Sequence, residues 1–268
     1  MFKQEIAVTP YYMEEQLDMP LRQVLSIMQD RVMNETSYFG VKALRSPIDS
    51  WIYQELIVAA KPDVIVEIGN ELGGGLLILA HLCDLLGHGR VIGVDLEHDR
   101  VPDAVRNHAR ITLIDGDACD SFSKVRKLVG VGERVLVIED SAHTYENTLD
   151  VLRLYSNLIS PGDYFIVEDS ICHHGLTVGP SPGPYEAIED FIKENPEFEI
   201  DRSRESFLIT WNPKGYIRRK SSPGSTARRS TTPARPRLPA RSTLRHALTL
   251  FVPPIVTQIV VALRDRAR

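Results

Sequence analysis

The stretch VIVEIGNELGGGLLILAHLCDLL (residues 64–86) changes character at its centre, and this change indicates the fold class. Its first part is a short β-branched run that ends at a glycine, and its last part reads as a helix. The glycines between the two parts permit a sharp turn of the backbone. A buried strand followed by a glycine-rich turn and a helix is typical of a parallel α/β sheet.

The same alternation of strands and helices continues along the chain. Further strands are expected at 90–95, 111–117, 134–140 and 164–169, a terminal hairpin at 198–200 and 206–211, and helices at 21–34, 46–62, 121–130, 146–159 and 185–195. Near-continuous apolar strands separated by helices are buried on both faces. We predict an α/β fold: a doubly wound, mostly parallel seven-stranded sheet with helices on both faces and a terminal antiparallel hairpin.

The composition changes near the end of this pattern. We expect a helical lead-in at 1–45, the α/β domain at 46–218, a disordered Ser/Pro/Arg-rich linker at 219–245 and an apolar and basic C-terminal helix at 246–268. The apolar run at 247–263 is at the short limit for a membrane span, and Pro253 and Pro254 interrupt it. A docked or interfacial helix is therefore expected there.

Charge is distributed unevenly. From Arg218 to the end the chain has 12 Lys and Arg and one acid, a net charge of +11, whereas the other 217 residues have 19 bases and 35 acids, a net charge of −16. An acidic body disfavours nucleic acid as a partner, because a surface that follows phosphates needs the opposite sign. The basic tail is a candidate for peripheral membrane contact, or for partner docking, or is simply solvated.

The N-terminal residues and the cysteines indicate the cellular compartment of the protein. The first ten residues, MFKQEIAVTP, contain an acid and no apolar core of a signal peptide. The spacing of Cys83, Cys119 and Cys172 suggests neither a disulfide framework nor a zinc site, so we expect reduced thiols in a cytoplasmic protein. A homo-oligomer is compatible with the sequence.

Ligands of such sheets bind beyond the carboxyl ends of the strands, where the loops are informative. The first loop, EIGNELGGG, would bring Glu67, Gly69, Gly73 and Gly74 to a ligand, or would serve only as a tight turn. It lacks the second glycine of the dinucleotide motif, and its extra acid at Glu71 disfavours a pyrophosphate.

The next two strand ends carry acids as well. Asp95 is suited to accept the hydroxyls of a ribose, and Asp117 with Ala118 would meet an adenine edge. Each acid taken singly is compatible with a solvated loop residue. The combination on three consecutive strand ends predicts an adenosine-containing ligand without phosphates, namely S-adenosylmethionine.

The fourth and fifth strands both end in Glu-Asp-Ser. Because neighbouring parallel strands lie about 4.8 Å apart, Asp140, Glu168 and Asp169 are expected to converge, where unpaired carboxylates would raise one another's pKa values. A hard cation relieves this repulsion, so we predict a Mg²⁺ site, with helix capping as the alternative. Glu139 points to the other face of its strand and is interpreted as structural.

His143 lies three residues beyond Asp140, at the mouth of the same site. A neutral imidazole there would remove a proton from a hydroxyl group. The alternative is a histidine that hydrogen-bonds the backbone at a helix N-terminus. His173 and His174, on the loop after the fifth strand, are further candidates for the substrate pocket.

Four segments resemble a known family: SPIDSWIYQELIVAAKPDVIVEIGNELGGG (46–75), EDSAHTYENTLDVLRLYSNLISPGDYFIVEDS (139–170), SPGPYEAIEDFI (181–192) and WNPKGYIRR (211–219). They are similar to the cephalosporin hydroxylase family, which despite its name comprises class I S-adenosylmethionine-dependent methyltransferases with a Rossmann-like sheet, including macrolide and rhamnosyl sugar O-methyltransferases. The resemblance covers roughly residues 45–218.

The resemblance implies a Mg²⁺-dependent O-methyltransferase, for which we expect a sugar or other glycosylated acceptor because vicinal hydroxyls chelate a metal, or a glycolipid because of the basic tail. It implies Asp140, Glu168 and Asp169 as metal ligands and His143 as the base, and it assigns the methyl donor to these residues: Glu67, Gly69, Asp95 and Asp117. Relatives usually have Ser where this chain has Gly75, which removes one polar contact to the donor's methionine end.

Two other readings are open at this stage. The family name suggests an oxygenase, and Asp140 with His143 and His173 would imitate a two-His-one-carboxylate iron site. That reading leaves the glycine loop and Asp95 without a ligand. A non-catalytic scaffold that uses its tail to bind a partner is the second alternative.

Overall fold

The computed structural model describes residues 12–221, and the predicted linker and C-terminal helix lie outside this range except for residues 219–221. The central sheet has seven strands in the order β5-β4-β3-β6-β7-β9-β8. Its strands are β3 (Val64–Ile68), β4 (Arg90–Asp95), β5 (Ile111–Asp115), β6 (Val135–Glu139), β7 (Tyr164–Val167), β8 (Phe198–Ile200) and β9 (Tyr216–Arg219). The first five run parallel, whereas β9 is antiparallel to both β7 and β8. The predicted α/β class and terminal hairpin are confirmed.

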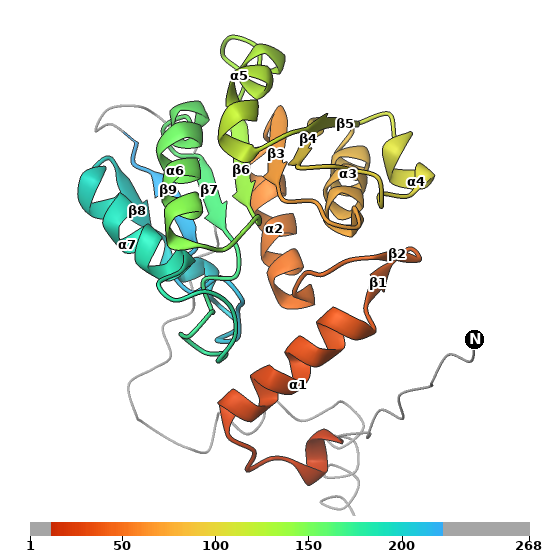
Figure 1. Cartoon of the computed structure of the whole chain (residues 1–268), viewed down its shortest axis with the longest axis vertical. Coiled ribbons are helices and arrows are strands. Elements are labelled where there is room, and N and C mark those ends of the chain that lie inside the picture. Colours follow the sequence, from red (N-terminus) through yellow and green to blue (C-terminus); the bar gives the residue numbers. More distant parts are fainter. Residues whose placement is uncertain (1–11, 222–268) are drawn as a thin grey trace, which may run out of the picture. The chain divides into compact units, whose positions relative to one another are not determined.

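Helices cover both faces of this sheet (Figure 1). On one face pack α2 (Pro47–Ala60), α3 (Gly74–Leu86) and α4 (Asp103–Arg106), and on the other α5 (Ala118–Leu128), α6 (Tyr145–Tyr155) and α7 (Pro184–Glu194). Successive side chains of a strand alternate between these faces, so Val66 and Ile68 join one core while Ile65 joins the other. The helices predicted in these regions are confirmed, but α4, with four residues, was not predicted.

The N-terminal segment consists of α1 (Leu21–Asn34) and a separate two-stranded sheet of β1 (Ser37–Tyr38) and β2 (Val41–Lys42). The predicted helix at 21–34 matches α1. Leu25 of this helix packs against Ile171 and Leu176, which come after β7, and against Trp211, which lies between β8 and β9. The lead-in is therefore packed against the loops beyond the sheet. Short 3-10 helices lie at Met13–Glu15, Ser156–Leu158 and Arg202–Arg204.

The hairpin differs from the prediction in its second strand. The segment 206–211 was predicted as that strand, but it forms turns, and the strand is β9 at Tyr216–Arg219. Phe207 and Leu208 are exposed, and Leu208 has a φ of 70°. The Thr210 hydroxyl and the Trp211 N–H donate to the buried Asp49 carboxylate at 2.5 and 2.8 Å. Hydrogen bonds to a residue far away in the sequence thus replace the strand pairing that the apolar pattern suggested.

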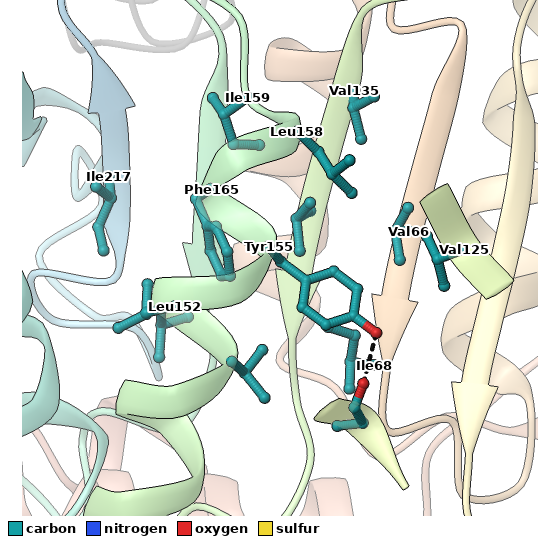
Figure 2. Close-up of a cluster of buried hydrophobic side chains, with 14 of the residues drawn as sticks. Val66, Ile68, Val125, Val135, Leu152, Tyr155, Leu158, Ile159, Phe165 and Ile217 are labelled. Carbon is teal, nitrogen blue, oxygen red and sulfur yellow. Dashed lines mark hydrogen bonds between the residues drawn. The ribbon is translucent and has the colours of Figure 1, made fainter. Parts of the chain in front are cut away.

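The larger core fixes the carboxyl ends of the strands relative to the helices. Figure 2 shows Tyr155 of α6 at its centre, fully buried, with Phe165 of β7 and Val66 and Ile68 of β3 around it. The Tyr155 hydroxyl donates to the Ala118 carbonyl at 2.7 Å. A buried hydroxyl needs such a partner, and this bond ties α6 to the first residue of α5. The start of α5 is thereby held beside the ends of β3 and β6.

Within residues 12–221 no helix is long and apolar enough to cross a membrane. The apolar run at 247–263 and its predicted membrane contact fall outside these residues. Cys83, Cys119 and Cys172 are all free thiols, in agreement with the sequence analysis.

Candidate functional site

A cavity of 510 Å³ lies at the carboxyl ends of the parallel strands. This is the position expected for ligands in a doubly wound sheet, where the strand order reverses between β4, β3 and β6. The segment between β2 and α2 lines it from the N-terminal side. Nine candidate residues line the cavity: Glu67, Gly69, Gly74, Asp95, Asp117, Ala118, Asp140, His143 and Asp169. Gly73 and Glu168 are not among the lining residues, and His173 and His174 also lie elsewhere.

A close approach between two loops requires a glycine at position 69. Its φ is 87°, and a Cβ at this position would lie 1.9 Å from the Asp140 carbonyl oxygen. A side chain is thus excluded by the neighbouring backbone and by the conformation itself. The glycine allows the β3 and β6 ends to meet, and the Asp140 N–H donates to the Ile68 carbonyl at 2.7 Å. The glycine-rich loop and the acidic side of the cavity are consequently joined at this residue.

Asp95 shapes the glycine-rich loop. Its carboxylate accepts hydrogen bonds from the N–H groups of Asn70 at 2.7 Å, Glu71 at 2.9 Å and Leu96 at 2.7 Å. A carboxylate offers about four lone-pair positions, so these bonds leave room for a ligand hydroxyl. Asp95 therefore holds the loop and also faces the cavity.

Asp117 is the N-cap of α5. Its side chain accepts from the N–H groups of Cys119 and Asp120 at 2.8 and 3.2 Å. These bonds give acceptors to N–H groups of the first helical turn that have no partner within the helix. The capping role fixes the start of α5, so that Ala118 is buried at the cavity wall.

One buried residue that supports the glycine-rich loop was missed in the sequence. His98 is buried and bridges two strand ends: its Nε2 lies 2.8 Å from Oδ1 of Asn70, and its Nδ1 contacts the Asp115 carboxylate. Its surroundings, LEHDR, look like an exposed polar loop. Nothing in that pattern signals a buried histidine.

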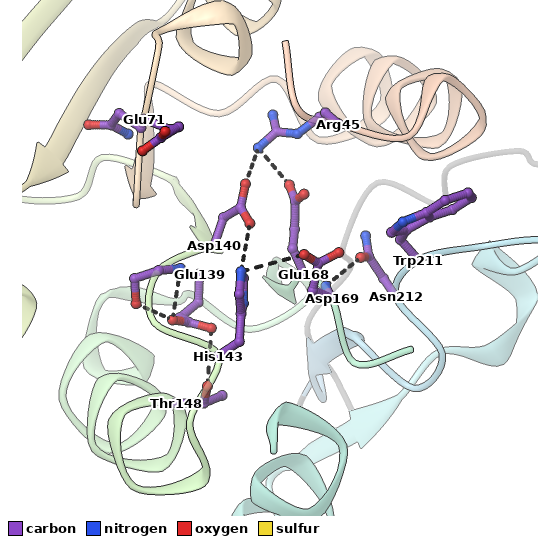
Figure 3. Close-up of polar contacts among 12 residues, drawn as sticks. Arg45, Glu71, Glu139, Asp140, His143, Thr148, Glu168, Asp169, Trp211 and Asn212 are labelled. Atoms are coloured by element: carbon purple, nitrogen blue, oxygen red, sulfur yellow. Dashed lines mark hydrogen bonds and ion pairs between the residues drawn. The ribbon is translucent and has the colours of Figure 1, made fainter. Parts of the chain in front are cut away.

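Acidic side chains gather on the other side of the cavity around a single arginine, Arg45 (Figure 3). Nη2 of Arg45 lies 2.6 Å from Oε1 of Glu67, 2.6 Å from Oε1 of Glu168 and 3.4 Å from Oδ2 of Asp140. The Tyr53 hydroxyl also donates to Glu168, at 2.8 Å. The predicted convergence of Asp140 and Glu168 thus takes place around a guanidinium that the sequence analysis did not identify.

Burial dominates the electrostatics of this cluster. It raises the pKa of Glu168 to about 7, although Arg45 favours the charged form. It also raises the pKa of Asp140 well above the usual range, with a further contribution from the Glu168 carboxylate, and it raises that of Asp169. Burial alone would lower the pKa of Arg45, but Glu168 and Glu67 raise it well above its usual value. One fixed cation is insufficient to keep all the acids charged.

His143 lies between two of these acids (Figure 3). Its Nε2 is 3.4 Å from Oδ2 of Asp169 and 3.8 Å from Oδ1 of Asp140. Its Nδ1 is buried and has no hydrogen-bond partner among residues 12–221. His143 and Asp169 have φ values of 56° and 54°. Such conformations cost free energy in residues other than glycine and concentrate at functional sites.

Ligand atoms of Asp140, His143 and Asp169 lie within 4.8 Å of one another, a geometry that could hold a metal ion. Glu168, the third predicted ligand, is not in this group, and its Oε1 contacts Arg45 and Tyr53.

Glu139 has the structural role expected from its side of the strand. It is fully buried and accepts hydrogen bonds from Ser141 Oγ at 2.5 Å, Asn147 Nδ2 at 3.4 Å and Thr148 Oγ1 at 3.4 Å. Thr144 caps α6 by accepting from the Asn147 N–H at 3.3 Å. These bonds fix the loop that carries Asp140 and His143.

Comparisons with known proteins agree with this architecture. The model of the family described as rhamnosyl O-methyltransferase/CmcI matches residues 30–220. The rhamnosyl O-methyltransferase of Mycobacterium leprae (strain TN) is 31% identical over 195 residues, which cover 70% of this chain and 85% of that protein. The enzyme of the same name from Mycobacterium tuberculosis (strain ATCC 25618 / H37Rv) is 31% identical over 193 residues, covering 69% and 79% of the two chains.

Solved structures support the fold. A CmcI structure with Mg and SAM superposes with a TM-score of 0.57 at 22% identity, covering 72% of this chain and 84% of that one. An apo structure of CmcI gives a TM-score of 0.55 at 24% identity, with 70% and 77% covered. The resemblance and the enzyme class inferred from the sequence are thus confirmed at the level of the family: the chain belongs to the rhamnosyl O-methyltransferase/CmcI family.

Proposed function

We propose that the protein transfers a methyl group from S-adenosylmethionine to a sugar hydroxyl, with Mg²⁺ held by Asp140, Glu168 and Asp169 and with His143 as the base. The observation that carries the proposal is the buried acidic cluster beside the cavity at the strand ends. Family membership supports the methyl donor, and a CmcI structure contains Mg and SAM.

The acidic cluster fits a divalent cation. Glu67, Asp140 and Glu168 contact the single guanidinium of Arg45, and Asp169 lies in the same cluster beside His143. When all four acids are ionised, three negative charges are therefore not compensated by Arg45. Oxygen ligands of this kind suit Mg²⁺. When bound, Mg²⁺ would act as a Lewis acid that polarises the acceptor hydroxyl. The donor is a zwitterion with an added sulfonium charge, and together with a divalent cation it would balance the site.

His143 is placed to move the proton. Its Nε2 faces the Asp140 and Asp169 carboxylates, so an acceptor hydroxyl bound beside them lies within reach of the imidazole. A neutral imidazole accepts the proton, and the neighbouring carboxylates stabilise the imidazolium that forms. Asp169 and Asp140 thus orient the base as well as the acceptor.

The opposite side of the cavity suits the donor. The whole cavity, at 510 Å³, lies within the common range for small-molecule sites, roughly 300–1,000 Å³. Asp95 keeps acceptor capacity for ribose hydroxyls, and Ala118 offers an apolar wall for an adenine. Direct displacement at the methyl carbon then requires chiefly that the two substrates be held in line.

A rhamnosyl group is the preferred acceptor. The similar mycobacterial enzymes are named rhamnosyl O-methyltransferases, and vicinal sugar hydroxyls offer two neighbouring oxygens to a metal. The oxygenase reading finds no support in the described residues. The one candidate metal cluster within 12–221 contains a single histidine, and His173 Nε2 instead lies 3.0 Å from the Gly179 carbonyl oxygen.

The direct test uses chelator-treated protein, methyl-labelled S-adenosylmethionine and a panel of rhamnosides, with and without added Mg²⁺. We expect label in the rhamnoside only when Mg²⁺ is present, and loss of that label in Asp140→Asn. Transfer that is independent of Mg²⁺ would refute the metal role. Labelling of non-sugar catechols but of no glycoside would refute the acceptor class.

A further inference from the structure

Arg45 is held in a defined position by the start of α2. The next residue, Ser46, is the N-cap of α2 and accepts from the Asp49 N–H at 3.3 Å, and Pro47 begins the helix. The Arg45 side chain then runs inward, past the Tyr53 ring, and only 5% of the residue is exposed. Arg45 is among the residues that line the cavity.

The guanidinium uses only part of its hydrogen-bonding capacity. Nη2 makes all the contacts with Glu67, Glu168 and Asp140. Nε and Nη1 are buried and have no partner among the described residues. Buried donors without acceptors cost free energy. This free side of Arg45 therefore indicates an acceptor that belongs to a ligand.

The free side of Arg45 lies against the first turn of α3. A Cβ built on Gly75 would lie 3.2 Å from Nη1 of Arg45 and 2.7 Å from Oε1 of Glu67, so the absence of a side chain at Gly75 makes room for this ion pair. Gly74 and Gly75 line the same cavity. The first N–H groups of a helix lack intrahelical acceptors, and the helix dipole adds a partial positive charge.

Two independent features at one point therefore attract an anion: a buried guanidinium with free donors and the start of a helix of 13 residues. Planar guanidinium groups bind carboxylates particularly well. The Glu67 carboxylate beside them would attract an ammonium group. A carboxylate next to an ammonium group is the chemistry of an α-amino acid.

We propose that Arg45 and the start of α3 bind the α-carboxylate of the methyl donor's amino-acid end, on the cavity side of Gly75. The inference rests on the proposed function and assigns Arg45 as a donor-binding residue. Arg45 also contacts the acids of the metal site through Nη2, so one side chain joins the donor's amino-acid end to the acidic cluster.

The test compares two ligands by calorimetry in the presence of a chelator. S-adenosylhomocysteine has the amino-acid end, whereas 5′-methylthioadenosine keeps the nucleoside and lacks it. For the wild-type protein we expect S-adenosylhomocysteine to bind at least about 100-fold more tightly. In Arg45→Met its affinity should fall at least about tenfold, while that of methylthioadenosine stays within about twofold. Arg90→Met, which removes an arginine outside the cavity, should leave the ratio unchanged.

The outcomes separate the two proposals. If the wild-type protein binds neither ligand, the proposed function is wrong. If it binds S-adenosylhomocysteine but Arg45→Met keeps the same ratio, or loses both ligands equally, only the Arg45 assignment is wrong. Should Arg45→Met fail to fold because Glu67 and Glu168 are left buried without a counter-charge, Arg45→Lys is measured instead. It should lower the ratio by a smaller factor, and an unchanged ratio would contradict the assignment.

Discussion

The acidic residues at the two ends of the parallel strands differ in their ion-pair partners. At the amino ends, Glu133 accepts two hydrogen bonds from Arg90, at 2.7 and 2.8 Å, and Asp163 pairs with Arg134. At the carboxyl ends, several acids share Arg45. The same sheet therefore carries matched ion pairs at one end and an excess of negative charge at the other.

Two glutamates show the consequence. The hydrogen bonds from Arg90, together with the Gly130 N–H, lower the pKa of Glu133 to about 2. Burial raises that of Glu168 to about 7, although Arg45 lies beside it. Opposite shifts in one residue type separate a carboxylate that accepts hydrogen bonds near the surface from one that is buried among other acids. The predictions below test that distinction.

The largest effect is expected for Asp140→Asn. This change removes one charge from the proposed metal site and keeps the size of the side chain. Methyl transfer should fall at least about 100-fold, while affinity for S-adenosylhomocysteine should change by less than about threefold, because Asp95 and the glycine loop are unaltered. Initial rates with labelled donor and calorimetry provide the two measurements. Equal losses in both would indicate a folding defect instead.

His143→Gln should lower kcat by about 10²- to 10⁴-fold, since the proton acceptor is removed. Glutamine keeps a polar group of similar length, so Mg²⁺ and S-adenosylhomocysteine should bind as in the wild-type protein. A matching loss of Mg²⁺ affinity would make His143 a ligand rather than a base.

The raised pKa of Glu168 predicts a pH-dependent stability of the metal-free protein. Because the pKa is about 7 in the folded state and 4.5 ordinarily, the folded protein retains a proton that the unfolded chain releases between these values. The free energy of unfolding should therefore fall by roughly 3 kcal/mol as pH rises from about 4.5 to about 7. Urea unfolding across this range measures it, and Glu168→Gln should flatten the slope. An identical slope in the variant would contradict the assignment.

The smallest effect is expected at the paired end. Glu133 has a lowered pKa, so its contribution is present above about 4.5 and is lost as pH falls towards about 2. Glu133→Gln should cost about 1 kcal/mol of unfolding free energy at pH 7, as is usual for a pair near the surface, and should leave methyl transfer unchanged. A reduced rate of methyl transfer in the folded variant would contradict the comparison.

The sequence predicted the parallel strands well, because each is a compact apolar run bounded by turn residues, as in 64–69 and 90–95. It failed for 206–211, where Thr210 and Trp211 bond to Asp49, some 160 residues earlier in the chain. Local pattern carries no information about such a partner.

The site was also predicted in part, namely where its residues lie at the ends of strands. Strand ends reveal Asp95, Asp140 and Asp169, because neighbouring parallel strands bring their ends together. Arg45 was missed, since it comes from a segment before the sheet and meets acids 22, 95 and 123 positions later. A lone arginine before a Ser-Pro helix start reads as a surface residue.

Titration of Mg²⁺ into chelator-treated protein tests the central claim most directly. With S-adenosylhomocysteine present, calorimetry should detect about one Mg²⁺ per wild-type chain and the same for Glu133→Gln at the paired end. Asp140→Asn should show no saturable binding. Absence of Mg²⁺ binding by the wild-type protein, or equal binding by Asp140→Asn, would contradict the assignment of the acidic cluster as a metal site.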